Sequence, residues 1–296
     1  MTTISPSDRG RTLIEALPYI NRFAGQTVVI KYGGHAMKDE ALKKSFALNV
    51  ILLRAVGIYP VVVHGGGPQI GQLLDRLSID CRFVDGMRVT SPEVMNVVQM
   101  VLVGQVNTGI VGLINANGGR AVGLNGHDGG LIQASRMTLQ RETGHDQPPE
   151  IVDLGLVGKV DKVNPQVLHS LEHGNFIPVI APVGVGPEGE SLNINADLVA
   201  SAVAAGLRAS KLILLTDTPG VMDAGGKLLH ELTAKEAKLL QGQGVITGGM
   251  IPKVNCCLQA LERGVERAHI IDGRVANALL LEIFSDQGVG TIFSDR

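Results

Sequence analysis

The sequence contains no tryptophan, three tyrosines and only three cysteines in 296 residues. Cys81 stands alone, and Cys256 and Cys257 are adjacent. Three cysteines cannot form an even disulfide framework, and adjacent cysteines do not have the spacing of zinc ligands. We therefore expect no disulfide scaffold and no metal site, and the reducing cytoplasm as the compartment of this chain.

Charged residues are also scarce, at 18% of the chain, and 26 basic against 28 acidic residues give a formal net charge of −2. No run of like charge predicts binding to nucleic acid or to an anionic membrane. Residues 1–11 lack the apolar run of a secretory signal. The uncharged stretch 94–119 is interrupted by Asn, Gln and Thr residues, so we expect a buried helix there rather than a membrane span.

Glycine is what the sequence has in excess, with 38 residues, nearly double the ordinary usage of roughly 7%. Because 45% of the residues are hydrophobic, the chain can bury a large core, which excludes low-complexity disorder. The glycines cluster irregularly, which excludes a collagen-like chain. They must therefore serve turns, close packing or the approach of a ligand to the backbone.

Short β-branched runs alternate with amphipathic segments along the chain. The expected strands are 27–30, 60–63, 176–180, 212–215 and 268–271, and the expected helices are 39–56, 68–77, 196–207, 233–241 and 251–263. This alternation predicts an α/β fold with a largely parallel sheet covered by helices. Residues 121–163 alternate over shorter stretches and predict hairpins added to that sheet.

A separate short helix is predicted before the first strand, over 11–23. Its apolar residues share one face, Pro18 would kink it, and Gly25 can end it. A helix this short is only marginally stable alone. We expect it to pack on the body of the protein or on another subunit.

Two predicted strands end in glycine-rich turns that carry a basic or polar side chain. Lys31 precedes Gly33 and Gly34, and His64 precedes the three glycines 65–67. In open α/β sheets ligands bind at these strand ends, where backbone N–H groups can approach a phosphate and a lysine can neutralise it. For Lys31 a solvated lysine over a tight turn is an equal alternative, whereas three consecutive glycines exceed what a simple connection needs.

The common nucleotide-binding motifs are absent from the sequence. No G-x-x-x-x-G-K-[ST] segment occurs, which excludes a P-loop, and the glycines at 65–67 lack the third glycine of a dinucleotide fingerprint. A phosphate site in this chain must use another arrangement.

Further polar residues stand at predicted helix starts and strand ends. Arg88 suits capture of a carboxylate, with a surface ion pair as the alternative. Asn193 and Asp197 lie at the start of an apolar helix, and the alternative there is that Asn195 or Asp197 only caps that helix. Lys253 lies at the electrostatically unfavourable N-terminal end of a helix, a conflict that a bound polyanion would remove. Residues 216–217 follow another strand and suit either a nucleotide contact or a plain turn.

Taken together, seven segments resemble the amino acid kinase family, and within it the arginine-sensitive acetylglutamate kinases, over about residues 12–293. They are Val-Ile-Lys-Tyr-Gly-Gly from Val29, Val-His-Gly-Gly-Gly-Pro from Val63, Gly-Met-Arg-Val-Thr from Gly86, Asp-Leu-Gly-Leu-Val-Gly from Asp153, Asn-Ile-Asn-Ala-Asp from Asn193, Leu-Thr-Asp from Leu215 and Gly-Gly-Met-Ile-Pro-Lys from Gly248. Each segment is weak alone, but their joint order is highly specific.

The resemblance implies a three-layer αβα sandwich with a mainly parallel central sheet. It implies phosphorylation of the side-chain carboxylate of N-acetyl-L-glutamate by ATP with Mg²⁺, the second step of arginine biosynthesis, without a tightly bound metal site in the protein. It also implies three parts: an oligomerisation helix in 1–25, an amino-acid substrate domain in 26–207 that also dimerises, and a nucleotide-binding domain in 208–296.

The resemblance assigns residues to four roles when it is carried over by position. The catalytic residues are Lys31 and Lys253, which stabilise the transition state, and Asp197, which holds them in place. The substrate-binding residues are Gly66, Gly67, Arg88 and Asn193. The nucleotide-binding residues are Gly33, Gly34, Thr216, Asp217, Gly248 and Gly249. The residues of an arginine effector site are Tyr19, Lys211, His269, Glu282, Gly288 and Gly290, and Glu282 could pair with the guanidinium.

Several partners follow from the same resemblance. L-arginine is expected as a feedback inhibitor, the helix at 94–115 as a dimer interface, and the N-terminal helices as the elements that join homodimers into a hexamer. Some enzymes of this type bind the nitrogen-signalling protein PII, and the sequence leaves open whether this one does. Residues 125–129 depart from the family pattern, which usually has Ser or Thr followed by Lys there.

Two other functions remain open from the sequence. One is a kinase of the same fold that acts on N-acetyl-aminoadipate, another amino acid or carbamate. The other is a non-catalytic amino-acid sensor, against which the retained Lys31, Asp197 and Lys253 argue.

Overall fold

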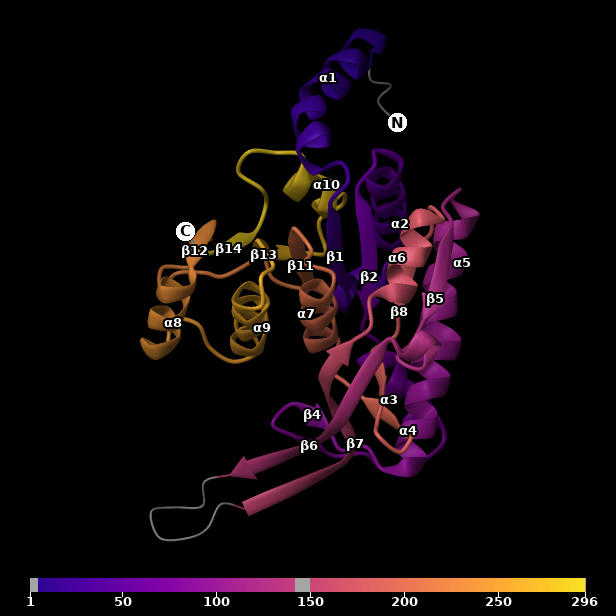
Figure 1. Cartoon of the computed structure of the whole chain (residues 1–296). Helices are drawn as coiled ribbons and strands as arrows, with labels where there is room; N and C mark the ends of the chain where they lie inside the picture. The colour runs from indigo at the N-terminus through magenta and orange to yellow at the C-terminus, as the bar shows by residue number, and fades with distance from the viewer. Residues whose placement is uncertain (1–4, 142–149, 296) are drawn as a thin grey trace.

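The computed structural model describes residues 5–141 and 150–295 (Figure 1). Its helices are α1 (Pro6–Phe23), η1 (Gly34–Met37), α2 (Glu40–Ala55), α3 (Gly67–Arg76), α4 (Pro92–Gln99), η2 (Met100–Asn107), α5 (Thr108–Ala116), η3 (Asp128–Gly130), α6 (Gln166–His173), α7 (Ala196–Gly206), α8 (Ala234–Gly242), α9 (Met250–Glu262) and α10 (Ala278–Ile283). Its strands are β1 (Thr27–Tyr32), β2 (Tyr59–His64), β3 (Phe83–Val84), β4 (Met87–Arg88), β5 (Ala121–Leu124), β6 (Ile132–Arg141), β7 (Glu150–Val163), β8 (Ile177–Ile180), β9 (Val183–Val185), β10 (Ser191–Asn193), β11 (Lys211–Thr216), β12 (Glu231–Thr233), β13 (Arg267–Asp272) and β14 (Thr291–Ser294). The strands and helices expected after residue 26 are present, with ends shifted by no more than two residues.

An 8-stranded sheet runs through the centre in the order β12-β14-β13-β11-β1-β2-β8-β5. β1 pairs in parallel with β11 on one side and with β2 on the other. The parallel pairing continues to β13 at one end and to β8 and β5 at the other. β14 runs antiparallel to β13. The prediction of a mainly parallel sheet is therefore confirmed.

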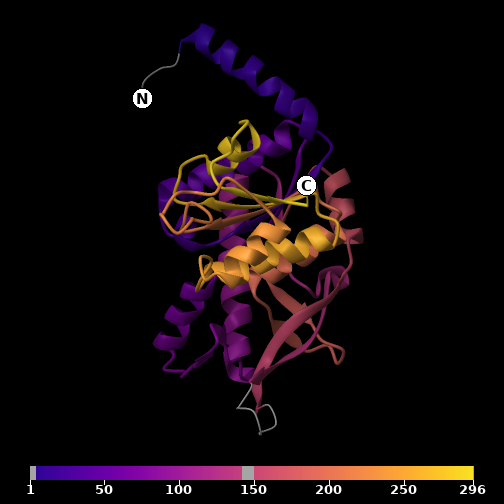
Figure 2. The ribbon, with the colours of Figure 1, turned by 90° about the vertical axis from the view of Figure 1, so that its left-hand side faces the viewer.

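Helices cover both faces of this sheet. Within β1, Val28 and Ile30 belong to one buried hydrophobic cluster and Val29 belongs to a second. The first cluster includes residues of α2, α5 and α10, and the second includes residues of α6, α7, α8 and α9. Figure 2 shows α8 and α9 on the side of the sheet opposite α10. Burial on both faces explains why the strands are continuous apolar runs, and it confirms the three-layer αβα sandwich.

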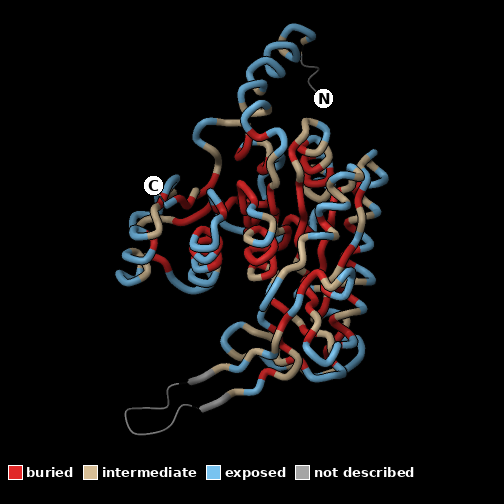
Figure 3. Tube along the Cα trace, in the orientation of Figure 1, coloured by how far each residue is buried: buried red, intermediate tan, exposed pale blue. Residues whose placement is uncertain are grey.

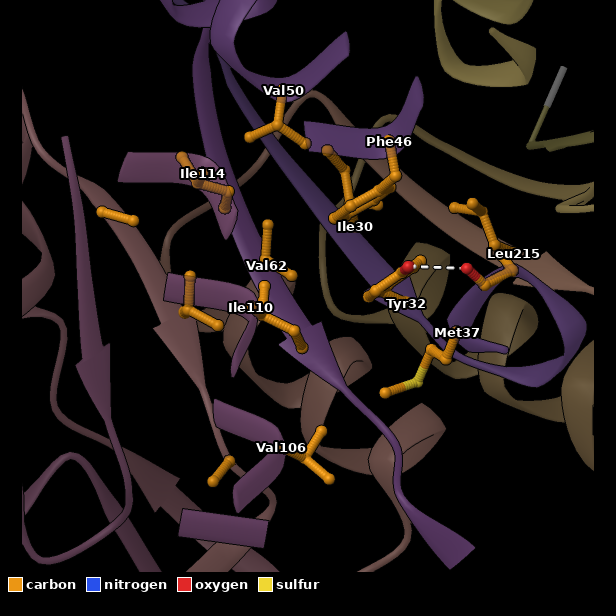
Figure 4. Close-up of a cluster of buried hydrophobic side chains, with 14 of the residues drawn as sticks. Ile30, Tyr32, Met37, Phe46, Val50, Val62, Val106, Ile110, Ile114 and Leu215 are labelled. Carbon is orange, nitrogen blue, oxygen red and sulfur yellow. Dashed lines mark hydrogen bonds between the residues drawn. The ribbon is translucent and has the colours of Figure 1, made fainter. Parts of the chain in front are cut away.

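The first cluster joins the central strands to α2 and to the long helix that ends in α5 (Figure 4). The ring of Tyr32, at the end of β1, stacks on the ring of Phe46 of α2, with centroids 3.7 Å apart. The buried Tyr32 hydroxyl donates a hydrogen bond to the carbonyl of Ala36 at 2.7 Å. This packing fixes the carboxyl end of β1 and the turn that follows it.

The segment from 121 to 163 differs from the prediction of hairpins added to the central sheet. β5 joins that sheet as a parallel edge strand beside β8. β6 and β7 do form an antiparallel hairpin, but they close a separate small barrel with β9 and β10. The prediction was wrong about the partner because an alternating pattern reports that a strand has two different faces, and it does not say which strand lies beside it.

Helix α1 starts at Pro6, five residues before the expected start, because Ser5 caps it with its side-chain oxygen. It continues as one helix across Pro18 to Phe23, its one buried residue. The helix stands away from the body of the molecule (Figures 1 and 3). Its outward apolar residues Leu13, Ile14 and Leu17 are 69%, 71% and 50% exposed.

Pro92–Ala116 is a continuous apolar helix made of α4, η2 and α5, with a mean hydropathy of 1.7 over its most apolar window. Length and composition alone would let it cross a membrane. In the structure 44% of that window is buried inside the protein, and Val98, Val101 and Ile114 are among the buried residues of the first cluster. The other face is exposed, so the expected buried helix is buried on one side in this single chain.

The boundary expected near residue 207 falls between α7 and β11. The central sheet crosses it, because β1 of the N-terminal part pairs with β11 of the C-terminal part. The division into a substrate part and a nucleotide part therefore stays a prediction about function.

Candidate active site

Three neighbouring parallel strands end at the same edge of the central sheet. β1 carries Lys31 near its carboxyl end, β2 ends at His64 and β11 ends at Thr216. Since loops that follow adjacent parallel strands emerge side by side, the glycines after β1 and β2 and Asp217 after β11 lie along one edge. The sheet topology thus gathers most of the residues that the sequence singled out.

Lys31 and Lys253 both form ion pairs with Asp197. The Nζ atom of Lys31 lies 3.0 Å from Oδ1 of Asp197, and the Nζ atom of Lys253 lies 2.9 Å from Oδ2. Burial by itself would raise the pKa of Asp197, but the two lysine charges outweigh it and lower the pKa. Two ammonium groups share one carboxylate, so one positive charge remains for an anion to neutralise.

The three residues come together from separate elements. Asn195 caps α7 by accepting hydrogen bonds from the amides of Asp197 and Leu198 at 2.8 and 3.4 Å. Since Asn195 provides the cap, capping as the role of Asp197 is wrong, and its carboxylate is free to bind the lysines. Lys253, in the first turns of α9, has the Asp197 carboxylate as the partner that offsets its unfavourable position.

A cavity of about 490 Å³ lies next to this cluster, since Asn195, Ala196 and Leu198, which flank Asp197, form part of its wall. The four predicted substrate-binding residues also line it: Gly66, Gly67, Arg88 and Asn193. Its apolar wall includes Ile70, Phe83, Leu102, Met137 and Val157. Such a cavity suits a small molecule with carboxylate groups and an apolar portion.

Arg88 is held from three sides at the edge of this cavity. Its Nη2 donates to the carbonyl of Gly67 at 3.2 Å, and its Nη1 donates to Sγ of Cys81 at 3.5 Å. The guanidinium carbon lies 4.6 Å from the centroid of the Phe83 ring. Within the described ranges no carboxylate pairs with Arg88, so the surface ion pair is wrong. No motif in the sequence pointed to the contacts of Arg88 with Phe83 and Cys81.

Asn193 is a second polar residue in the wall of the cavity. It lies in β10, and its Nδ2 donates to Oγ1 of Thr90 at 3.2 Å. Thr90 in turn forms an isolated parallel bridge with Gly155. Oγ1 of Thr90 also donates to the carbonyl of Arg88 at 2.9 Å, so the barrel formed by β6, β7, β9 and β10 places Asn193 in the same part of the cavity wall as Arg88.

The turn after β1 meets the turn after β11. Oδ1 of Asp217 accepts the amide hydrogen of His35 at 2.7 Å. Gly34 has a φ of +70°, and a Cβ atom there would lie 2.5 Å from the same carboxylate oxygen, so that glycine is required on both counts. Gly33 lies against Nζ of Lys31. This approach places two of the predicted nucleotide-binding residues between the lysine cluster and Asp217.

The remaining predicted nucleotide residues lie close to this edge. Thr216 is buried at the end of β11, and its carbonyl accepts the amide hydrogen of Gly273 at 2.8 Å. Gly248 and Gly249 immediately precede α9, the helix that carries Lys253.

The six predicted effector residues lie in one region on the other side of the sheet from α8 and α9, near the base of α1. Lys211 Nζ lies 3.3 Å from Nε2 of His269, and Nδ1 of His269 lies 2.6 Å from Oε1 of Glu282. The other oxygen of Glu282 accepts the amide hydrogens of Val289 and Gly290 at 2.7 and 3.2 Å. Both oxygens of Glu282 thus already have partners within the chain.

Burial shifts the pKa values of two members of this cluster. Burial lowers the pKa of Lys211 to about 8 and that of His269 to about 4. Neutral His269 therefore accepts a hydrogen bond from the Lys211 ammonium and donates one to Glu282. Tyr19 joins the region from α1, since its hydroxyl donates to Oδ1 of Asp286 at 2.6 Å. The sequence did not identify Asp286, which lies in the same loop as the predicted Gly288.

The segment that departs from the expected family pattern forms a compact turn. Oδ2 of Asp128 accepts hydrogen bonds from the backbone and side-chain amides of Asn125 at 2.7 and 2.8 Å. Nε2 of His127 lies 2.8 Å from Oγ of Ser191 in β10. The turn thus supports the strand that ends in Asn193 and does not line the cavity itself.

Comparison with known proteins agrees with this geometry. Residues 26–272 match the model of the Amino acid kinase family. The chain belongs to the amino acid kinase family. Its curated relatives include proteins called acetylglutamate kinase from Geobacter sulfurreducens, 61% identical over 96% of this chain and 97% of the relative, and from Syntrophus aciditrophicus, 56% identical over 98% and 99%.

Solved structures of other proteins share the fold. N-acetylglutamate synthase from Neisseria gonorrhoeae, complexed with coenzyme A and N-acetyl-glutamate, is 25% identical with a TM-score of 0.81. The match covers 99% of this chain and 64% of the synthase, so the chain spans just under two thirds of that protein. Carbamate kinase from Giardia lamblia bound to AMP-PNP has a TM-score of 0.62 at 18% identity, over 92% of this chain and 99% of that one, and supports the fold alone.

Proposed function

We propose that this chain transfers the γ-phosphoryl group of ATP to the side-chain carboxylate of N-acetyl-L-glutamate, as a step of arginine biosynthesis. The observation that carries the proposal is the Lys31–Asp197–Lys253 cluster beside a cavity lined by Arg88 and Asn193. Relatives that are 56% to 61% identical over nearly their whole length are called acetylglutamate kinases, which supports the same acceptor.

Phosphoryl transfer to a carboxylate requires positive charge near the reacting groups and does not require a general base. The acceptor carboxylate is already ionised at pH 7. One of its oxygens forms a bond to the γ-phosphorus while the bond from that phosphorus to the bridging oxygen breaks, and ADP leaves with the electron pair. Because two anions must approach each other, ammonium groups and N–H donors dominate catalysis. Lys31 and Lys253 provide the charge, and Asp197 fixes their separation.

The cavity residues hold the amino acid in this proposal. Arg88 and Asn193 together bind the α-carboxylate, and the apolar wall receives the acetyl methyl group. The N–H groups of Gly66 and Gly67 face the reacting carboxylate and the phosphoryl group, and Gly34 lies close to the phosphoryl group on the side of Asp217. The C-terminal part, from residue 208, binds the nucleotide through residues that include Thr216, Gly248 and Gly249.

ATP brings Mg²⁺ to the site as part of the substrate in this proposal. Among residues 5–141 and 150–295, no three His, Cys, Asp or Glu side chains gather to hold a metal ion. The phosphate oxygens of the nucleotide are therefore the natural ligands.

Feedback inhibition by L-arginine is the regulatory part of the proposal. The gathering of Lys211, His269, Glu282, Gly288 and Gly290, with Tyr19 attached through Asp286, supports an effector site near the base of α1. Since both oxygens of Glu282 are already bonded, a guanidinium must share or replace the His269 contact. Binding would thereby move the loop 285–290, to which Tyr19 connects α1.

Self-association completes the proposal. The exposed apolar face of Pro92–Ala116 supports a homodimer through this helix, and the exposed Leu13, Ile14 and Leu17 support joining of dimers into a hexamer through α1. Binding of a PII-type protein stays a prediction from the sequence resemblance.

The substrate is tested by measuring ADP release with a panel of acceptors. N-acetyl-L-glutamate is expected to give the highest kcat/KM, with N-acetyl-aminoadipate, aspartate and carbamate at least 10-fold lower. A binding pocket typically discriminates by about this factor between substrates that differ by one methylene or by one polar group. A higher kcat/KM for another acceptor would reassign the substrate. No ADP release with any acceptor would favour a non-catalytic sensor.

A further inference from the structure

His64 is a fully buried polar residue at the end of β2, directly before the glycines that line the cavity, and the roles proposed above do not use it. Its side chain is 0% exposed. Nδ1 lies 2.8 Å from the carbonyl oxygen of Gly65, and Nε2 lies 3.2 Å from Nδ2 of Asn107. Both ring nitrogens are therefore engaged.

Asn107 determines which nitrogen of His64 carries the proton. Nδ2 of Asn107 also lies 2.9 Å from the carbonyl oxygen of Val179, which can only accept. The amide group must therefore donate toward both Val179 and His64, so Nε2 of His64 accepts. Burial lowers the pKa of His64 to about 4, so the ring is neutral at pH 7. Its single N–H is on Nδ1 and donates to the Gly65 carbonyl.

That hydrogen bond fixes the orientation of one peptide group. No cis peptide bond occurs in the described residues, and in a trans peptide the carbonyl and the N–H point in opposite directions. Because the Gly65 carbonyl points toward His64, the N–H of Gly66 points away from His64. Gly65, Gly66 and Gly67 line the cavity, whereas His64 does not. The Gly66 amide has no acceptor among the described residues and is available to a ligand.

Without such a bond this peptide could rotate easily. It lies between two glycines, which have no Cβ atom to resist a change of φ and ψ. A rotated peptide would turn the Gly65 carbonyl, an acceptor, toward the place where two anionic reactants meet. The π-helix η2 stabilises the observed orientation of the Gly65–Gly66 peptide with two residues. Asn107 binds His64, and the side chain of Leu102 fills the space beside Gly66.

We propose that His64 is a positioning residue: it locks the Gly65–Gly66 peptide so that the Gly66 N–H faces the reacting groups, and Asn107 of η2 holds His64 in the required tautomer. The proposal rests on the phosphoryl transfer proposed above. It assigns a function to the buried polar pair that links the long apolar helix to the glycine turn.

Substitutions of His64 can separate the effect of its hydrogen bond to Gly65 from the effect of its side-chain volume. His64→Asn places an amide nitrogen close to the position of Nδ1 and can still donate to Gly65. His64→Gln places its amide nitrogen near the position of Nε2, and His64→Leu has no donor. We expect kcat to fall on the order of 10²-fold in the Gln and Leu variants, as when one N–H donor to a developing charge is lost, and to fall less than about 5-fold in the Asn variant. KM for ATP should stay within about 2-fold in all three, because the lost contact is made in the transition state.

Asn49→Leu is the matched control for the loss of a buried hydrogen bond. Asn49 is 2% exposed and donates to Asn277 at 2.9 Å, away from the cavity. This variant should lower the melting temperature with kcat unchanged. Equal kcat values in the Asn, Gln and Leu variants of His64 would overturn the proposal.

A crystal structure of the His64→Leu variant tests the lock without using activity. The Gly65 carbonyl is expected to have turned toward the cavity, and a carbonyl that keeps its orientation would refute the lock. If the wild-type protein releases no ADP with N-acetyl-L-glutamate, the proposed function fails, and the structure of the variant still decides whether His64 holds the peptide.

Discussion

At the scale of single residues, Asp197 determines where the two lysines of the site lie. Each of its oxygens binds one ammonium group, so the lysines stay a fixed distance apart in spite of their mutual repulsion. Removing either lysine would leave Asp197 with one partner and would cancel the positive charge that attracts an anion. The charge of the cluster, rather than its shape alone, is therefore what the reaction uses.

Replacing either lysine tests this role. We expect Lys31→Ala and Lys253→Ala each to lower kcat on the order of 10²-fold or more, because each removes a charge that stabilises the transferring group. Steady-state ADP release with saturating ATP and N-acetyl-L-glutamate measures the effect. Lys238→Ala is the control, since Lys238 is 61% exposed and pairs with Glu262 on the surface. Near wild-type turnover in either site variant would remove the cluster from catalysis.

Arg88 is expected to act in binding more than in turnover. Arg88→Lys keeps the charge but loses the planar fork that can grip a carboxylate and stack on Phe83. KM for N-acetyl-L-glutamate should rise roughly 10-fold or more, with a smaller change in kcat. An unchanged KM would show that the α-carboxylate binds elsewhere in the cavity.

The sequence predicted Lys31, Asp197 and Lys253 because each stands at a strand end or a helix start, where sequence motifs can be recognised. It could not predict that Asn195, rather than Asp197, caps α7, since either residue type suits a cap. The contact between His64 and Asn107 could not be predicted from the sequence either. The two residues are 43 positions apart, and their contact depends on the packing of η2 against β2.

At the scale of elements, α1 has an apolar face that stays exposed within the described part of the chain. It presents Leu13, Ile14 and Leu17 to solvent, while its base is attached to the body through Phe23 and through the Tyr19–Asp286 hydrogen bond. Exposed apolar faces of this kind mark interaction surfaces. The helix could be predicted from the sequence, whereas its start at Pro6 depended on the cap provided by Ser5.

A triple substitution on α1 tests its role without shortening the chain. Leu13→Asp, Ile14→Asp and Leu17→Asp together should leave a folded dimer, because these side chains contribute little to the core of the single chain. We expect kcat without arginine to change less than about 2-fold and arginine inhibition to be lost. Light scattering after size exclusion gives the assembly size, and ADP release with and without arginine gives the inhibition. A hexamer that arginine still inhibits would contradict this role.

At the scale of the whole molecule, one sheet joins the elements around the cavity to the C-terminal strands. The sequence predicted its strands and their parallel direction, because burial on both faces leaves continuous apolar runs. It could not predict the barrel formed by β6, β7, β9 and β10, since the pairings of β6 with β9 and of β7 with β10 join strands that are far apart in the chain. That barrel carries Asn193 to the cavity, so part of the site depended on the mispredicted region.

Buried histidines should make the stability of the molecule depend on acidity. The pKa values of His64 and His269 are lowered from 6.5 to about 4. Between these values the unfolded chain binds protons that the folded chain does not, so stability is complete above pH 6.5 and is lost as the pH falls toward 4. Each histidine contributes up to about 3 kcal/mol to this loss.

Urea unfolding at pH 7 and at pH 4.5 measures the difference. The wild-type protein should lose more unfolding free energy between the two pH values than a variant with His64→Asn and His269→Asn. Equal losses in both proteins would show that other groups control the acid sensitivity.

The most direct test of the central claim is to identify the product. An acyl phosphate reacts with hydroxylamine to give a hydroxamate, so the wild-type protein with ATP, Mg²⁺, N-acetyl-L-glutamate and hydroxylamine should form one hydroxamate for each ADP released. The Lys253→Ala variant should form neither at a comparable rate. Release of ADP without hydroxamate, or hydroxamate formation that does not depend on Lys253, would contradict phosphorylation of the side-chain carboxylate at this site.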